Sequence, residues 1–302
     1  MRASAPHGGR DVGLAVLALL FNAFTWGLSW WPLRTLHAAG LHPLWATALT
    51  YASVVAVLAA MRPARLRDVA RTPALWVLLL ASGLTNATFN WGVATGDVVR
   101  VVLLFYLMPL WSVLLARWLL HEPLHAAVLL RAALAVAGAL IVLTPDGGGW
   151  PWPRATADWL GLAGGIAFAL NGVMLRREAA REPIARALAM FSGGAVIGGA
   201  GALAGGAFGV PAPAWSATAA WLPLALLLAL WFMASNLSLQ YGSARLRAST
   251  TAVVMVSEVL FASVSAVALG AATLQPRTLV GAVLIAAAAL MAAWHEGRRA
   301  AQ

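Results

Sequence analysis

Apolar residues form ten long runs along the chain, separated by short segments rich in Pro, Gly and Arg. Each run has about 20 residues, the length of a helix that crosses a bilayer. The runs are continuous and rich in Leu and Ala, so they predict helices and not the alternating strands of a membrane barrel. They cover approximately residues 12–31, 43–61, 73–93, 99–119, 124–143, 157–175, 184–206, 218–239, 248–269 and 275–294.

The composition indicates an integral membrane protein. Hydrophobic residues make up 62% of the 302 residues and charged residues 10%, whereas a soluble domain has roughly a quarter charged residues. The same apolar excess excludes a disordered chain, and the absence of Cys excludes disulfides and thiolate metal sites. The net charge of +10 comes from Arg alone and must lie outside the bilayer core. No nucleic-acid partner is expected, because no soluble domain could display a basic face.

The positions of the Arg residues predict the orientation in the membrane. With the N-terminus in the cytoplasm, Arg34, Arg100, Arg154 and Arg277 fall on the outer side and all other Arg on the cytoplasmic side. We therefore expect a multi-pass protein of a bacterial-type inner membrane with both termini cytoplasmic. The first run lacks a small-residue cleavage site, so we interpret it as a membrane helix and not as a removed signal peptide.

A Pro- and Gly-rich segment near the middle divides the ten runs into two halves of five. Because five is odd, the second half is inverted relative to the first, an architecture that recurs in transporters. Residues 109–122 and 131–143 have counterparts of similar spacing in 259–272 and 281–293. The predicted organisation is a cytoplasmic N-terminus at 1–11, five-helix repeats at 12–143 and 157–294, a linker at 144–156 and a cytoplasmic C-terminus at 295–302.

Short motifs occur at Phe24 to Trp30, Met108-Pro109, Leu120 to Leu124, Ser257-Glu258-Val259, Leu269-Gly270 and Pro276 to Gly281. Together they resemble the EamA family of the drug/metabolite transporter superfamily. Each half keeps part of that family's repeat pattern: the first half has the Pro of a Glu-Pro step, and the second half has the Glu. The resemblance covers nearly the whole chain and implies a ten-helix inner-membrane carrier, often an exporter of amino acids or related metabolites.

Polar and aromatic side chains share faces of several predicted helices. On the first helix they recur at intervals of three and four residues, which places them on one side. Such faces either line a central cavity or bond neighbouring helices together. The six His lie at or beyond helix ends, so neither a metal nor a cofactor is expected. The candidate cavity residues are Asn22, Trp26, Asn86, Tyr106, Asn171, Ser235 and Glu258.

Glu258 is the most unusual of these residues, because it lies near the centre of the predicted ninth helix. A charged acid at that depth costs at least ~2.5 kcal/mol, so we expect it to be protonated or paired with a cation. It would bind a substrate ammonium group or carry a proton in exchange. Alternatively, it is a neutral carboxyl group that bonds to neighbouring backbone or hydroxyl groups.

Three further residues are candidates for gating. Asp97 and Arg100 lie three residues apart near the outer mouth, so they form a solvated ion pair or an outer gate. Pro109 lies in the predicted fourth helix and is expected to kink it, as a hinge or as a shape for the cavity. A glycine-rich face on the seventh helix suits internal packing or a dimer contact, so the protein is expected to be a monomer or a homodimer.

These features favour a secondary transporter that moves a small organic metabolite, an amino acid or a related compound, by alternating access, with export as the expected direction. An exporter of organic cations or amines, with Glu258 as counter-ion or proton carrier, is the alternative within this class. A non-transporting helix bundle or an intramembrane enzyme would belong to other classes, and no enzyme is expected. No nucleotide-binding motif is present, so ATP is not the expected energy source.

Overall fold

The computed structural model describes residues 9–120, 126–144, 152–178, 180–243, 245, 254–255, 257–273 and 275–299. Every regular element in these residues is a helix, and the described chain contains no strand, which confirms the all-α class. The predicted linker at 144–156 and the predicted N-terminal segment at 1–11 lie largely outside the described residues. Of the predicted C-terminal segment, residues 295–299 belong to the last helix and residues 300–302 lie outside the described chain.

The helices of the first part of the chain are α1 (Gly9–Leu28), α2 (Trp30–Ala38), α3 (Pro43–Met61), α4 (Ala64–Arg71), α5 (Pro73–Thr95), α6 (Val98–Phe105), α7 (Met108–Leu120) and α8 (Ala126–Leu143). Those of the second part are α9 (Thr156–Arg177), α10 (Pro183–Gly205), the short 3₁₀ turns η1 (Gly206–Phe208) and η2 (Trp215–Ala217), α11 (Thr218–Ser243), α13 (Ser257–Ala268) and α14 (Pro276–Arg299). Proline opens α3, α5 and α10, where its missing N–H has no intrahelical partner to lose.

Five helical segments of the described chain are long and apolar enough to cross a membrane, or up to six if α4 and α5 count as one bent span. The five are Gly13–Ala38, Pro43–Met61, Thr156–Leu175, Pro183–Gly205 and Trp215–Gly242. Shorter apolar helical stretches occur at Ala133–Val142, Ser257–Ala268 and Pro276–Ala288. A multi-pass membrane protein is therefore supported, and the count of ten crossings stays a prediction.

Two of the predicted helices are interrupted in the structure. The first run continues past Leu28 as α2, and at the junction the hydroxyl of Ser29 donates to the carbonyl of Trp26. The run predicted at 99–119 is divided into α6 and α7, with Tyr106 and Leu107 between them. Pro109 is the second residue of α7, and it has no N–H to bond the carbonyl of Phe105, so the helix of α6 cannot continue through it.

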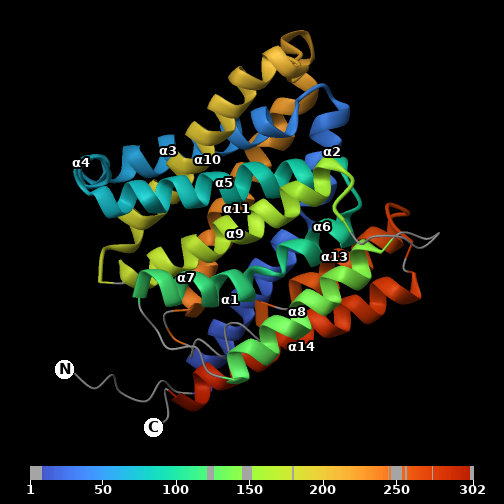
Figure 1. Ribbon diagram of the computed structural model, residues 1–302. Coiled ribbons are helices and arrows are strands. Elements are labelled where there is room, and N and C mark those ends of the chain that lie inside the picture. The colour runs from blue at the N-terminus through green and yellow to red at the C-terminus, as the bar shows by residue number, and fades with distance from the viewer. Residues whose placement is uncertain are drawn as a thin grey trace.

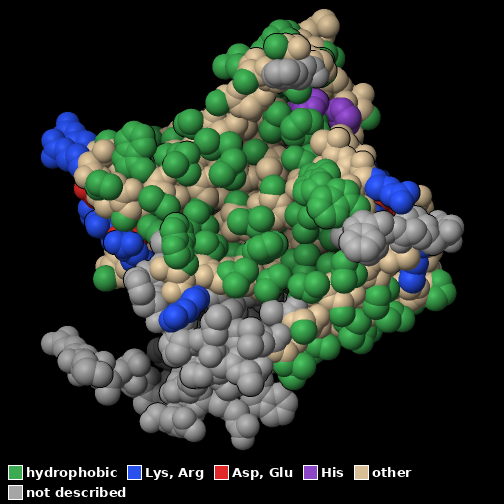
Figure 2. All heavy atoms as spheres, in the orientation of Figure 1, with side chains coloured by type: hydrophobic (Ala, Val, Ile, Leu, Met, Phe, Trp, Pro, Cys, Tyr) green, Lys and Arg blue, Asp and Glu red, His purple; other side chains and the backbone are tan. Residues whose placement is uncertain are grey.

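The helices pack as a bundle in which elements from both parts of the chain alternate (Figure 1). α5 lies against α9 and α10, α1 lies against α11 and α13, and α8 pairs with α14. Apolar side chains cover the middle of the face in Figure 2, and Arg side chains gather towards the two ends. This band of apolar surface between charged ends is the pattern expected of a protein that lies across a bilayer.

Candidate functional site

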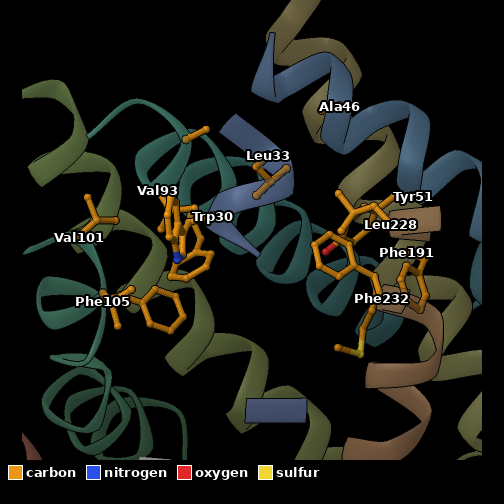
Figure 3. Close-up of a cluster of buried hydrophobic side chains, with 14 of the residues drawn as sticks. Trp30, Leu33, Ala46, Tyr51, Val93, Val101, Phe105, Phe191, Leu228 and Phe232 are labelled. Carbon is orange, nitrogen blue, oxygen red and sulfur yellow. The ribbon is translucent and has the colours of Figure 1, made fainter. Parts of the chain in front are cut away.

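The centre of the bundle holds a cluster of aromatic rings and one amide, contributed by four helices. Trp26 of α1 stacks on Phe232 of α11, with ring centroids 4.8 Å apart and an interplanar angle of 16°. The ring of Tyr51 of α3 lies 5.9 Å from that of Phe232, and its hydroxyl donates to Oδ1 of Asn86 of α5 at 2.6 Å. Figure 3 shows Tyr51 and Phe232 close together beside Phe191. We call Trp26, Tyr51, Asn86, Phe89 and Phe232 the central cluster.

The amide side chains predicted for the cavity are buried, and they differ in how well they are bonded. The Nδ2 group of Asn22 donates to the carbonyl of Ser235 at 3.0 Å and to its hydroxyl at 2.7 Å, which joins α1 to α11. Asn86 donates to the carbonyl of Ser82 on its own helix. The Oδ1 atoms of Asn22 and Asn171 are buried without a hydrogen-bond partner in the described chain, which is an unfavourable state for a buried polar atom.

Glu258 forms a second polar group with Tyr106, and the two residues lie 152 positions apart in sequence. The hydroxyl oxygen of Tyr106 is 3.0 Å from Oε2 of Glu258 and 2.7 Å from the carbonyl oxygen of Met255. Glu258 is 5% exposed and is the second residue of α13. The sequence places it near the middle of a longer helix at 248–269, of which residues 248–253 and 256 lie outside the described chain.

A series of ring contacts connects the two groups. The ring of Phe89, which touches Trp26, lies 4.9 Å from the ring of Phe105. Phe105 in turn contacts the rings of Tyr106 and of Phe168 on α9. The structure thus brings Trp26, Asn86, Tyr106 and Glu258 into one connected group, which sequence spacing alone could not establish.

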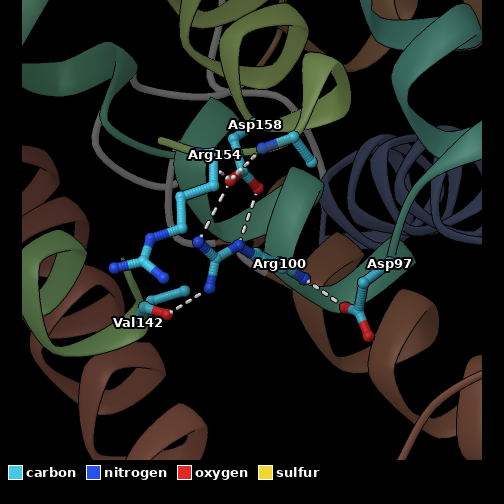
Figure 4. A network of polar contacts seen from close by, with 6 residues as sticks. Asp97, Arg100, Val142, Arg154 and Asp158 are labelled. Carbon is cyan, nitrogen blue, oxygen red and sulfur yellow. Dashed lines mark hydrogen bonds and ion pairs between the residues drawn. The ribbon is translucent and has the colours of Figure 1, made fainter. Parts of the chain in front are cut away.

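The predicted ion pair between Asp97 and Arg100 is wrong, because the guanidinium of Arg100 pairs with a different acid. Oδ1 of Asp97 accepts from the backbone N–H of Arg100 at 2.8 Å and caps the start of α6, as Asp does at many helix N-termini. The Arg100 guanidinium instead binds both carboxylate oxygens of Asp158 on α9, at 2.6 and 3.1 Å, and the carbonyl of Val142 (Figure 4). Short-range spacing suggested a local pair, whereas the helix packing offers Arg100 a more buried acid.

Sequence reasoning missed three residues of these groups: Tyr51, Phe232 and Asp158. Asp158 could have been found, because it is an acid in the first turn of a predicted membrane helix. In the structure it is 2% exposed. Phe232 follows Trp231, and nothing in the local pattern shows that Phe232 faces the core. Pro109 lies in the first turn of α7. Its role as a hinge stays a prediction.

Comparisons with known proteins concern the fold and the family. A solved crystal structure, titled "Crystal structure of protein", matches the chain with a TM-score of 0.57 and 21% sequence identity. The match covers 94% of this chain and 98% of the other, and at this identity it concerns the fold alone. Among curated proteins, none matches the chain.

The sequence model of the EamA-like transporter family matches residues 13–144, which run from the start of the first candidate span to the end of α8. The match includes Trp26, Asn86 and Tyr106. The resemblance that the motifs indicate is confirmed over residues 13–144, where the chain matches the model of the EamA-like transporter family. This family belongs to the drug/metabolite transporter superfamily, and its members are membrane transporters.

Proposed function

We propose that the chain is a secondary transporter that carries a small organic metabolite, an amino acid or a related compound, across the membrane by alternating access. Export is the direction we propose, with the charged end that holds α4 on the cytoplasmic side. The observation that carries the proposal is the buried Glu258–Tyr106 pair, which joins the two predicted halves beside the central cluster. A substrate would enter by parting the stacked rings of Trp26 and Phe232.

The packing of the helices supports an arrangement of two inverted halves. If the halves exchange, α1 with α2 corresponds to α9, α3 to α10, α5 to α11, α6 with α7 to α13, and α8 to α14. The contact of α5 with α9 then has its counterpart in α11 with α1, and that of α6 with α9 in α13 with α1. The pairs α3–α10 and α8–α14 each correspond to themselves. A bundle with such paired contacts can open towards either side by equivalent movements.

The Tyr106 hydroxyl has one proton, so it can donate a hydrogen bond either to Glu258 or to the carbonyl of Met255. The carbonyl of Met255 can only accept a hydrogen bond. When Tyr106 donates to that carbonyl, its oxygen can bond to Glu258 only by accepting, which requires a protonated carboxyl group. When Glu258 is ionised, the hydroxyl turns to the carboxylate and the carbonyl of Met255 loses this hydrogen bond. Protonation of Glu258 is therefore linked to the backbone just before α13.

The described contacts of Glu258 are with a hydroxyl group and not with a cation. This favours the second candidate, an exporter of organic cations or amines, in which the carboxylate is the counter-ion of the substrate or exchanges it for a proton. Aromatic rings such as Trp26 also attract cations through their faces. Neutral zwitterionic amino acids use the same carboxylate for their ammonium group, so the two candidates share one site.

Reconstituted flux tests the proposal. We expect purified protein in proteoliposomes to transport at least one member of a panel of amino acids and amines. Glu258→Gln should lower that flux by about tenfold or more, because hydrogen bonds to charged groups contribute about 1.5–3 kcal/mol, and should flatten its dependence on pH. Asp68→Asn, the same acid-to-amide change at a half-exposed position, should behave as wild type.

Two different outcomes would contradict two different parts of the proposal. Flux of no panel member in any variant would count against a transporter of these metabolites. Flux with an unchanged rate and pH profile in Glu258→Gln would preserve the transporter and remove Glu258 from its mechanism.

A further inference from the structure

The short helix α4 is bent sharply away from the helix that follows it and is rich in charged residues. It is bent by 94° relative to α5, from which only Thr72 separates it. Four of its eight residues are charged: Arg65, Arg67, Asp68 and Arg71. Such a segment cannot lie in hydrocarbon, so α4 is neither part of a broken span nor a re-entrant loop. If α5 crosses the membrane, α4 runs parallel to the membrane surface.

One side of α4 is fixed to the protein. Val69 is 7% exposed and belongs to the main hydrophobic core. The guanidinium of Arg65 contacts Asp68 at 2.8 Å and Glu182 at the start of α10 at 2.5 Å. These contacts fix the rotation of α4 about its own axis, so they determine which of its side chains point away from the bundle.

The opposite side of α4 carries positive charge that no described acid neutralises. Arg67 and Arg71 are each two positions from Val69, about 160° away around an α-helix, and they are four residues apart on one face. Arg62, Arg67 and Arg71 are exposed, and none of the described ion pairs includes them. The acids described near α4 already have Arg partners, because Asp68 and Glu182 bind Arg65 and Glu178 binds Arg177 and Arg181. Figure 2 shows Arg side chains gathered at this end of the molecule.

Exposed apolar side chains lie beside these Arg residues. Met61, at the end of α3, is 63% exposed, Leu66 of α4 is 40% exposed and Trp76 of α5 is 53% exposed. The indole N–H of Trp76 donates to the carbonyl of Ala70 near the end of α4. Trp and long apolar residues next to Arg are typical of the boundary between acyl chains and headgroups.

We propose that α4 is an interfacial helix that binds the phosphates of anionic phospholipids through Arg62, Arg67 and Arg71. The guanidinium group binds phosphate oxygens with two parallel hydrogen bonds, and a basic cluster at the membrane surface attracts anionic lipids. The apolar side chains enter the outer part of the acyl layer, while Arg67 and Arg71 remain among the headgroups. Because Arg65 ties α4 to α10, lipid binding stabilises the junction of the two parts of the chain.

Thermal unfolding of the full-length protein in nanodiscs tests this lipid site. Replacing phosphatidylcholine by phosphatidylglycerol should raise the unfolding midpoint of the wild type by several degrees. R67Q/R71Q should lose at least half of that increase, R67K/R71K should lose less, and R154Q, at an exposed Arg of another segment, should keep it. Free glycerol phosphate should have no effect. An equal increase in wild type and R67Q/R71Q, or the same effect from free glycerol phosphate, would overturn the proposal.

A second measurement does not depend on the Gln variants being folded. The chain has no Cys, so Ala70→Cys gives a single attachment point for a nitroxide label on the exposed part of α4. The label should show the collision rates with oxygen and with a water-soluble relaxation agent that are typical of headgroup depth. Collision rates typical of bulk water would contradict an interfacial position of α4.

Discussion

His42, the residue immediately before α3, makes stability depend on pH. Its Nδ1 atom accepts from the backbone N–H of Leu44 and its side chain is buried. Burial, and to a smaller degree the charge of His37, lowers the pKa of His42 from 6.5 to about 4. The neutral form is therefore favoured in the folded state, so its stabilising contribution is present above pH 6.5 and is lost as the pH falls towards 4.

We predict that His42→Gln loses less stability than the wild type between pH 6.5 and pH 4. The amide oxygen of Gln can still accept from Leu44, and it does not become protonated in this range. The measurement is the midpoint of thermal unfolding in detergent at several pH values, with His37→Gln at the exposed neighbour as the control. Parallel pH curves for wild type and His42→Gln would show that His42 does not titrate as described.

The sequence pattern identified residues of the candidate site, because they are polar residues within apolar runs. It did not identify the residues with which they form hydrogen bonds. Asn22, Tyr106 and Glu258 stand out because polar groups are rare within apolar runs. The partner of Asn22 is 213 residues away and that of Glu258 is 152 residues away, and helical spacing relates only residues within a few turns. The same limit explains why Arg100 was assigned to Asp97 instead of Asp158.

Among the helices, the long apolar ones were predicted well and the short ones were not. The predicted boundaries of 43–61 and 73–93 agree closely with α3 and α5, because Pro43 and Pro73 mark their starts. α4 lies in one of the Arg-rich segments between the predicted runs, and its eight residues, half of them charged, are too few and too polar to form a run of membrane-spanning length. The division of the fourth predicted helix between α6 and α7 falls at Tyr106 and Leu107, just before Pro109, where the sequence predicts a kink.

The contact of α5 with α10 depends on a glycine at position 193. A Cβ atom there would lie against the carbonyl oxygen of Leu79, closer than two such atoms can approach, and 2.9 Å from the backbone nitrogen of Gly83. Both obstacles belong to the backbone, so no side chain can rotate away. The two helices would have to separate to admit even a methyl group.

We predict that Gly193→Ala lowers the free energy of unfolding by about 1–3 kcal/mol, the usual cost of overpacking. The matched control is Gly172→Ala in α9, where a Cβ atom would have no neighbour within 4 Å. There the better helix propensity of Ala should leave stability unchanged or raise it by up to ~1 kcal/mol. Unfolding in a denaturing detergent measures both, and equal stability of the two variants would mean that α5 and α10 are not in close contact.

For the whole molecule, the all-helical architecture followed from composition and run length, whereas the way the halves interlock did not. The number and length of the apolar runs lead directly to a membrane bundle. Which helices touch is decided by packing between residues far apart in sequence, such as α1 with α11. The orientation that the Arg distribution predicts is open to direct measurement.

We predict that the two ends of the bundle lie on opposite sides of the membrane. Ala70 and Ala180 should be cytoplasmic, and Ala155 and Ala212 should face outwards; all four are exposed. Single Ala→Cys variants in the Cys-free chain can be treated with a membrane-impermeant maleimide in intact cells. Ala155→Cys and Ala212→Cys should react at once, and the other two only after the membrane is permeabilised. Labelling of all four from one side would disprove the predicted orientation.

The pairing of α8 with α14 has a consequence for how mutations combine. A Cβ atom on Gly138 would lie 2.8 Å from the carbonyl oxygen of Gly281, and one on Gly281 would lie 2.8 Å from that of Gly138. Their next neighbours also correspond, Ile285 for Gly138 and Val142 for Gly281. An Ala at either position would push the backbones of α8 and α14 apart, so an Ala at the other position would then meet less obstruction. The losses of stability from Gly138→Ala and Gly281→Ala should therefore be strongly sub-additive in the double variant.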